Sequence, residues 1–136
     1  MNPDVVHGND WRSLNPGEIG SWEPTQRVTV VVPCYNGQEP LALTFAALAN
    51  QTYPMDLLEV VIADDGSDPP IVVPPGAPFE ARVVAQERAG FGLARARNTG
   101  AVAATGSILV FLDCDMVPEP TQVEAHALSL IHTPSP

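Results

Sequence analysis

Short apolar runs, separated by polar and helix-forming stretches, dominate the pattern along this chain. Four runs, at residues 28–32, 58–63, 82–86 and 108–112, are rich in valine and isoleucine and largely lack polar alternation. Runs of this length and composition predict β-strands, and the missing alternation predicts that the strands are covered on both faces.

Apolar residues at helical spacing fill most of the gaps between these runs. Leu41, Phe45 and Leu48 share one helix face. We expect helices over 39–50, 91–104 and 121–131, and a proline-rich loop over 69–78. Strands that alternate with helices predict the α/β class, with a mainly parallel sheet, flanking helices and right-handed crossovers. Ligands of such sheets bind at the carboxyl ends of the strands.

The length of 136 residues is enough for one domain with one core. We divide the chain into a polar arm over 1–26, the main unit over 27–120, and a helix with a tail over 121–136. Trp11 and Trp22 are expected to pack the arm onto the main unit, with a loose leader as the alternative.

The net charge of −10, with no lysine in the chain, argues against nucleic acid as a partner, because phosphate backbones need a basic patch. An anionic small ligand stays open. It would need a metal ion and a few well-placed arginines, and Arg88, Arg95 and Arg97 fall within one short segment.

Cysteine usage and the N-terminal sequence bear on the cellular compartment. Cys34 and Cys114 form neither a CxxC pair nor a zinc pattern, so a disulfide framework is not expected and a reducing cytosol is the natural compartment. The first residues lack the basic and apolar regions of a signal peptide, and every apolar run is too short to span a membrane. We expect a cytoplasmic location, with the inner face of the membrane as an alternative, and membrane contact stays open.

Each predicted strand ends in residues with ligand chemistry, at 33–37, 64–68, 87–90 and 113–115. Side chains two apart in an extended chain share a side, so Asp113 and Asp115 can face one ligand while Cys114 points away. Two carboxylates at a strand end suit Mg²⁺ or Mn²⁺, which in turn suits a diphosphate. A solvated Asp-x-Asp turn is the alternative.

Four sequence blocks in order carry a resemblance to a known family. The blocks VTVVVPCYNG, VVIADDGS, GLARARNTGAVAATG and ILVFLDCDMVP resemble family 2 glycosyltransferases of the GT-A fold, over about residues 27–120. The resemblance implies a Rossmann-like nucleotide-binding half, a nucleotide-diphosphate sugar as donor, and inversion at the anomeric carbon. A UDP-sugar is favoured, and Mn²⁺ or Mg²⁺ is the implied cofactor.

The resemblance also implies roles for residues after the first strand and in the helix expected over 91–104. Pro33, Tyr35 and Glu39 match the loop that borders the nucleotide. Tyr35 would stack on or cover the base, with a core or rim tyrosine as the alternative. Arg97 would reach the base or the phosphates, whereas Arg95 is expected in solvent.

The acidic pairs receive the remaining roles that the resemblance implies. Asp65 matches the carboxylate near the base, where it could accept the N3–H of uracil. Asp64 is its neighbour and could instead hold the loop, and the sequence leaves that choice open. Asp113 matches the first aspartate of the DxD motif, near ribose and metal, and Asp115 matches the second, the direct metal ligand.

Members of this family continue well past the DxD motif, and the resemblance assigns the general base and most of the acceptor site to that continuation. We therefore expect a truncated chain that supplies the donor site and contains no catalytic base. We do not assign Glu119 or Glu124 as the general base, and we expect His126 and His132 on a helix surface. Exposed apolar surface is expected where a complementary domain would pack, with self-association as a consequence.

Three rival functions compete with this interpretation. The segment 90–95 resembles a dinucleotide fingerprint, but its sixth position is Arg95, where a small residue is needed, and it does not follow the first strand. A nucleotidyltransferase would carry a basic, glycine-rich loop after the first strand, and residues 34–37 contain no basic side chain. A catalytically inactive nucleotide-binding or interaction module is the third possibility.

Overall fold

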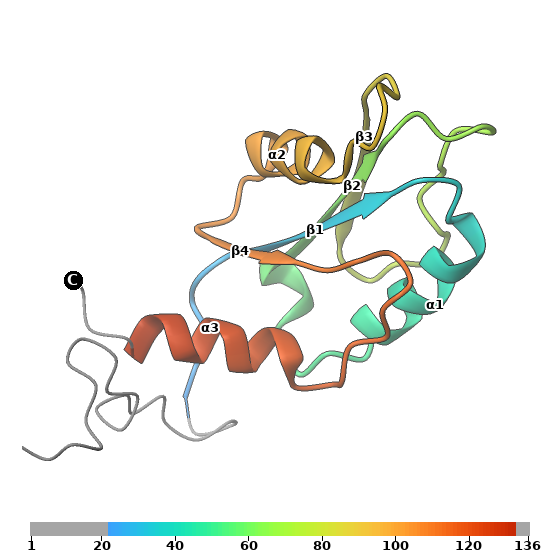
Figure 1. The fold of residues 1–136 in the computed structure, drawn as a ribbon. Helices are drawn as coiled ribbons and strands as arrows, with labels where there is room; N and C mark the ends of the chain where they lie inside the picture. Colours follow the sequence, from blue (N-terminus) through green and yellow to red (C-terminus); the bar gives the residue numbers. More distant parts are fainter. Residues whose placement is uncertain (1–21, 133–136) are drawn as a thin grey trace, which may run out of the picture.

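The computed structural model describes residues 22–132 and has an α/β fold (Figure 1). The elements in chain order are β1 (Val28–Cys34), α1 (Gln38–Leu48), the short 3₁₀ helix η2 (Met55–Leu57), β2 (Leu58–Asp64), β3 (Glu80–Ala85), α2 (Leu93–Ala103), β4 (Ile108–Phe111) and α3 (Gln122–His132). The four predicted strands and three predicted helices are confirmed, with ends that differ from the predicted ones by a few residues.

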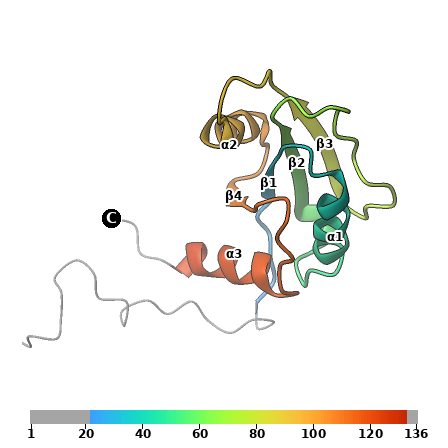
Figure 2. The same cartoon turned by 45° about the vertical axis from the view of Figure 1, so that its right-hand side comes forward.

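The strands form one parallel sheet in the order β3-β2-β1-β4, seen side by side in Figure 2. In register, Val31 of β1 pairs with Val61 of β2 on one side and with Phe111 of β4 on the other. All carboxyl ends therefore meet at one edge of the sheet, which brings the strand-end motifs together as the sequence predicted.

Helices cover the sheet from both sides (Figure 1). One core joins side chains of α1 and α3 to the sheet face that carries Val30, Val60 and Val110. On the opposite face α2 approaches so closely that a Cβ on Gly100 would stand 2.3 Å from a Val31 methyl carbon. The molecule is thus a three-layer α/β/α arrangement, the class that the alternating pattern predicted.

The prediction that all strands are covered on both faces is wrong for the two edge strands. Every residue of β1 and β2 is buried, whereas β3 is half-buried and β4 alternates between buried and exposed positions. Leu109 and Phe111 are 38% and 47% exposed, because α2 lies over the central strands and leaves β4 uncovered. An exposed apolar patch thus exists on β4, and both the packing of a complementary domain on it and self-association through it stay predictions.

The arm predicted over 1–26 is described only from residue 22 onward, and Trp11 lies outside the described residues. Trp22 packs against the core, and its ring lies 6.4 Å from the ring of Tyr53, centroid to centroid. The packing predicted for Trp22 is therefore confirmed.

A buried carboxylate joins the sheet to the end of α2. Glu59 of β2 is fully buried and accepts hydrogen bonds from the Thr29 hydroxyl at 2.6 Å and the Thr105 amide at 3.0 Å, with Arg82 as its ion-pair partner. Burial alone would raise the pKa of Glu59, but the donors outweigh it and hold the pKa at about 2. The charge therefore helps to fix the sheet beneath the site.

Candidate functional site

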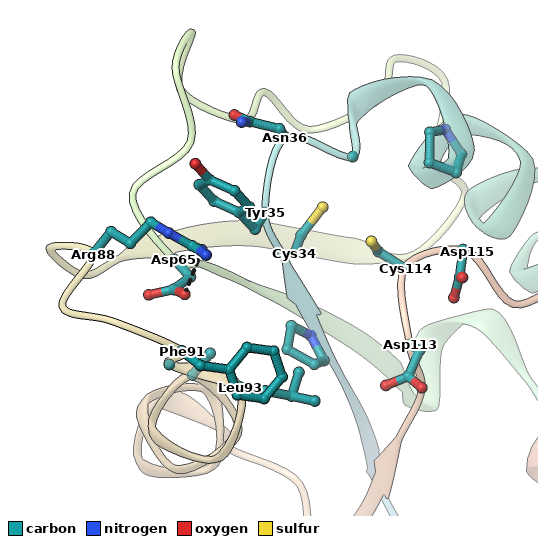
Figure 3. Close-up of a pocket in the computed structure, with 15 residues that line it drawn as sticks. Cys34, Tyr35, Asn36, Asp65, Arg88, Phe91, Leu93, Asp113, Cys114 and Asp115 are labelled. Carbon is teal, nitrogen blue, oxygen red and sulfur yellow. Dashed lines mark hydrogen bonds and ion pairs between the residues drawn. The ribbon is translucent and has the colours of Figure 1, made fainter.

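A cavity of about 430 Å³ opens at the carboxyl ends of the strands (Figure 3). Its lining combines the ends of β1, β2 and β4 with the segment that enters α2: Pro33, Cys34, Tyr35, Asn36, Gly37, Pro40, Asp65, Arg88, Phe91, Gly92, Leu93, Ala96, Asp113, Cys114 and Asp115. Acidic side chains stand on two sides of it, and apolar and aromatic groups lie between them.

The neighbouring aspartates at the end of β2 have different surroundings. Asp64 is buried, and its carboxylate accepts the backbone N–H groups of Ser67 at 3.0 Å and Ile71 at 3.1 Å. It thereby holds the loop after β2 and does not line the cavity. Asp65 does line the cavity, so the structure separates two residues that the sequence left as alternatives.

Asp65 is held by two donors from beyond β3. Its carboxylate accepts Gln86 Nε2 at 2.9 Å and an Arg88 guanidinium nitrogen at 3.1 Å. The same guanidinium lies 3.4 Å from the centre of the Tyr35 ring, a cation–π contact visible in Figure 3. Gly66 permits this approach, because its φ of +72° favours glycine and a Cβ there would lie 2.8 Å from the Arg88 amide nitrogen.

The segment that carries Asp113 and Asp115 turns instead of continuing the strand. β4 ends at Phe111, and the Met116 amide donates to the Asp113 carbonyl at 3.0 Å. The prediction that Cys114 points away is therefore wrong, because the turn directs all three of residues 113–115 to the cavity lining. Asp113 and Asp115 both line this cavity, and their joint role toward one ligand stays a prediction.

A buried hydroxyl from α1 holds this turn. Thr44 Oγ1 lies 2.7 Å from the Met116 carbonyl and 3.0 Å from the Cys114 carbonyl, and the Thr44 side chain is fully buried. The helix that packs on the core thus sets the position of the acidic turn.

Cys34 and Cys114 meet between the two acidic sides of the cavity. A Cβ added to Gly37 would lie 2.8 Å from Cys114 Sγ and 3.0 Å from Cys34 Sγ, so both sulfurs contact the same glycine. Both cysteines are free. Their mutual hydrogen bond lowers the pKa of Cys114 to about 7 and, together with burial, raises the pKa of Cys34.

The other predicted site residues divide into those at the cavity and those beside it. Pro33 and Tyr35 line the cavity, and Glu39 is exposed in the first turn of α1 outside the lining. Arg97 is not part of the lining, but its guanidinium donates to Asp113 Oδ1 at 3.2 Å. Arg95 is exposed, as expected, and donates to the Glu87 carbonyl.

Sequence reasoning named Arg88 only as one of three nearby arginines for an anionic ligand and gave no role to Phe91, and the structure brings both to the cavity. Arg88 falls within the strand-end segment 87–90, so its position was a usable signal. Phe91 is 89% exposed at the rim, and no local pattern marked it.

Within residues 22–132, no group of three or more His, Cys, Asp and Glu side chains is arranged to hold a metal ion. Asp113 and Asp115 offer two carboxylates, both exposed on the cavity side. Magnesium sites commonly use one or two carboxylates and complete the ligand set with substrate phosphates and water. The donor set therefore fits a divalent ion that arrives together with a diphosphate.

The carboxylates Glu119 and Glu124 both lie outside the cavity lining. Glu124, on α3, is buried and accepts a hydrogen bond from the Thr52 hydroxyl at 3.2 Å. Glu119 is exposed. Over the described part of the chain, no helix is both long and apolar enough to cross a membrane.

Comparison with known proteins gives one family and several relatives. The model of the family described as "Glycosyl transferase family 2" matches residues 29–134. The hyaluronan synthase of Pasteurella multocida is 32% identical over 136 residues, which cover 95% of this chain and 14% of that protein. The chondroitin synthase of Escherichia coli is 37% identical over 102 residues, 73% of this chain and 15% of that protein. The chain thus spans about a seventh of the length of these relatives.

Among solved structures, the mannosyltransferase PcManGT from Pyrobaculum calidifontis, in complex with GDP-Man and Mn²⁺, superposes with a TM-score of 0.65 at 29% identity. The match covers 91% of this chain and 39% of that protein. The predicted fold class, a Rossmann-like GT-A nucleotide-binding unit, is confirmed by this likeness.

Proposed function

The chain belongs to glycosyl transferase family 2, and from this membership we propose that it supplies the donor site of a glycosyltransferase that uses a nucleotide-diphosphate sugar. The observation that carries the proposal is one cavity with Asp65, Arg88 and Tyr35 on one side and Asp113 and Asp115 on the other. The first side has the chemistry to bind a base, and the second has the chemistry to bind a metal-bridged diphosphate.

On the base side, Asp65 is a carboxylate with spare accepting capacity. Two oxygens offer about four lone-pair positions, and two protein donors occupy part of them. An imide N–H of a pyrimidine base can be accepted at the remainder, which is why we favour UDP. The Tyr35 ring and the Arg88 guanidinium stacked on it provide a flat, cationic surface beside that position.

On the diphosphate side, we assign Asp115 as the direct ligand of Mn²⁺ or Mg²⁺ and Asp113 as its partner near the ribose. When bound, the ion would act as a Lewis acid that neutralises charge on the departing nucleoside diphosphate. Arg97 donates to Asp113 and fixes the direction of that carboxylate. The guanidinium also places positive charge beside the path of the leaving group, where charge develops. The Mn²⁺ present with GDP-Man in the Pyrobaculum calidifontis mannosyltransferase supports a divalent ion as the cofactor.

Transfer with inversion would require a general base that activates the acceptor hydroxyl. We assign no described residue to that role, since Glu124 is buried and Glu119 lies outside the cavity. The chain is proposed as the donor-binding part of the reaction, and the sugar and the acceptor are left unassigned.

Calorimetric titration of UDP in the presence of Mn²⁺ tests the proposal. We expect binding that disappears with a chelator and with Asp115→Ala, and that survives in Glu119→Ala, an exposed carboxylate outside the cavity. A parallel titration with GDP tests the choice of base, since GDP should bind more weakly. UDP affinity that is unchanged both by the chelator and by Asp115→Ala would refute the metal assignment. No binding by the folded chain in any arm would refute the donor site.

A further inference from the structure

We propose that Cys34 and Cys114 form a thiol–disulfide switch inside the cavity. A low-molecular-weight disulfide oxidises the pair, and the resulting bridge prevents a nucleotide from binding there. The effect on nucleotide binding rests on the proposed donor site, whereas formation of the bridge does not.

The geometry of the two sulfurs supports a bond between them. They come from separate elements, the end of β1 and the turn after β4, and Figure 3 shows them facing one another. Both lie within contact distance of Gly37, at the position that a Cβ would occupy. Since both sulfurs lie within 3.0 Å of that one point, the gap between them is short enough for a shift of the turn after β4 to close.

Access to the pair runs through the cavity. Both cysteines belong to its lining, so a small reagent that enters the cavity can reach them. Cys114 is half-buried and Cys34 is only 3% exposed, so the reagent meets Cys114 first. The chain has no other cysteine that could compete.

The reaction is two successive thiol–disulfide exchanges. Cys114 loses its proton and its sulfur attacks the reagent RS–SR, whose S–S bond breaks and releases one RS⁻. Cys34 then loses its proton and attacks the Cys114 sulfur in the mixed disulfide, which releases the second RS⁻. The two thiol protons go to the two leaving thiolates. The protein loses two electrons, and the reagent is reduced to two thiols.

The bridge would change the site because of what surrounds the sulfurs. Cys114 stands between the two carboxylates of the acidic turn, and Cys34 directly precedes Tyr35. A bond between them would draw the turn toward β1, away from the Thr44 hydroxyl that holds it. The carboxylates would leave the positions that the reduced state gives them, and the space between the two sides of the cavity would narrow.

The experiment treats the full chain with oxidised glutathione and measures its intact mass under native conditions. We expect a monomer that has lost two hydrogens, with Cys34 and Cys114 joined in a non-reducing peptide map and separated again by dithiothreitol. Cys34→Ser is expected to stop at a single glutathione adduct. A wild-type product that retains glutathione on both cysteines, stays reduced, or links two chains would overturn the proposal.

UDP titration of the same samples tests the effect of the bridge. We expect the oxidised chain to lose UDP binding in the presence of Mn²⁺, and dithiothreitol to restore it. Undiminished binding by the bridged chain would refute the switch. Failure of the reduced chain to bind UDP would instead count against the donor site, and the mass measurement would still decide whether the bridge forms.

Discussion

Replacing Glu59 by glutamine removes a buried negative charge while keeping the size of the side chain. The carboxylate is fully buried beneath α2 and is held by Thr29, Thr105 and Arg82. Because these donors hold its pKa near 2 in the folded protein, against 4.5 for a free glutamate, ionisation of Glu59 favours folding.

The pH dependence follows from the sign of that difference. A depressed folded-state pKa gives stability that is fully present above the unfolded pKa and is lost as the pH falls toward the folded one. A drop from 4.5 to about 2 corresponds to about 3 kcal/mol at pH 7. By the same relation about 1 kcal/mol should remain at pH 3. Glu59→Gln should therefore be markedly less stable than the wild type at neutral pH and approach it in acid.

Urea denaturation of both proteins at pH 7, 5 and 3, followed by circular dichroism, measures this difference. Glu80→Gln is the matched control, because Glu80 pairs with Arg27 but is 62% exposed at its side chain. An exposed pair contributes about 0–1 kcal/mol. A wild-type advantage over Glu59→Gln that is equal at pH 7 and pH 3 would refute the account, since it could not come from the ionised carboxylate.

Three further changes test the site. Arg88→Ala should weaken UDP binding about tenfold by calorimetry, since Asp65 loses a charged donor; unchanged affinity would remove Arg88 from the site. Thr44→Val should lower the free energy of unfolding by about 1–3 kcal/mol, because the buried hydroxyl that bonds the Met116 carbonyl is lost. Thr44→Ser should restore the stability, and equal losses in the two variants would exclude the hydroxyl. Gly66→Ala and Gly76→Ala both place alanine at positive φ, which should lower the free energy of unfolding by about 1–2 kcal/mol in each variant. In urea denaturation Gly66→Ala should lose more stability than Gly76→Ala, because its added Cβ also meets Arg88. Equal losses would refute the close approach.

Much of the fold and the approximate place of the site could be predicted from the sequence. Apolar runs such as 28–32 and 58–63 identify buried strands by composition, and helical spacing between runs makes the connections crossovers. The carboxyl ends of parallel strands lie at one edge of the sheet. The topology alone therefore predicts that Asp65, Asp113 and Asp115 gather there.

The orientation of side chains at that edge was decided only by the tertiary structure. Asp64 turns to the loop amides and Asp65 to the cavity, and Cys114 joins the lining because the backbone turns directly after β4. That turn is held by Thr44, a residue far away along the chain, and Arg88 reaches Asp65 from beyond another strand. Local sequence sets which residues end a strand, whereas contacts between distant segments set where their side chains point.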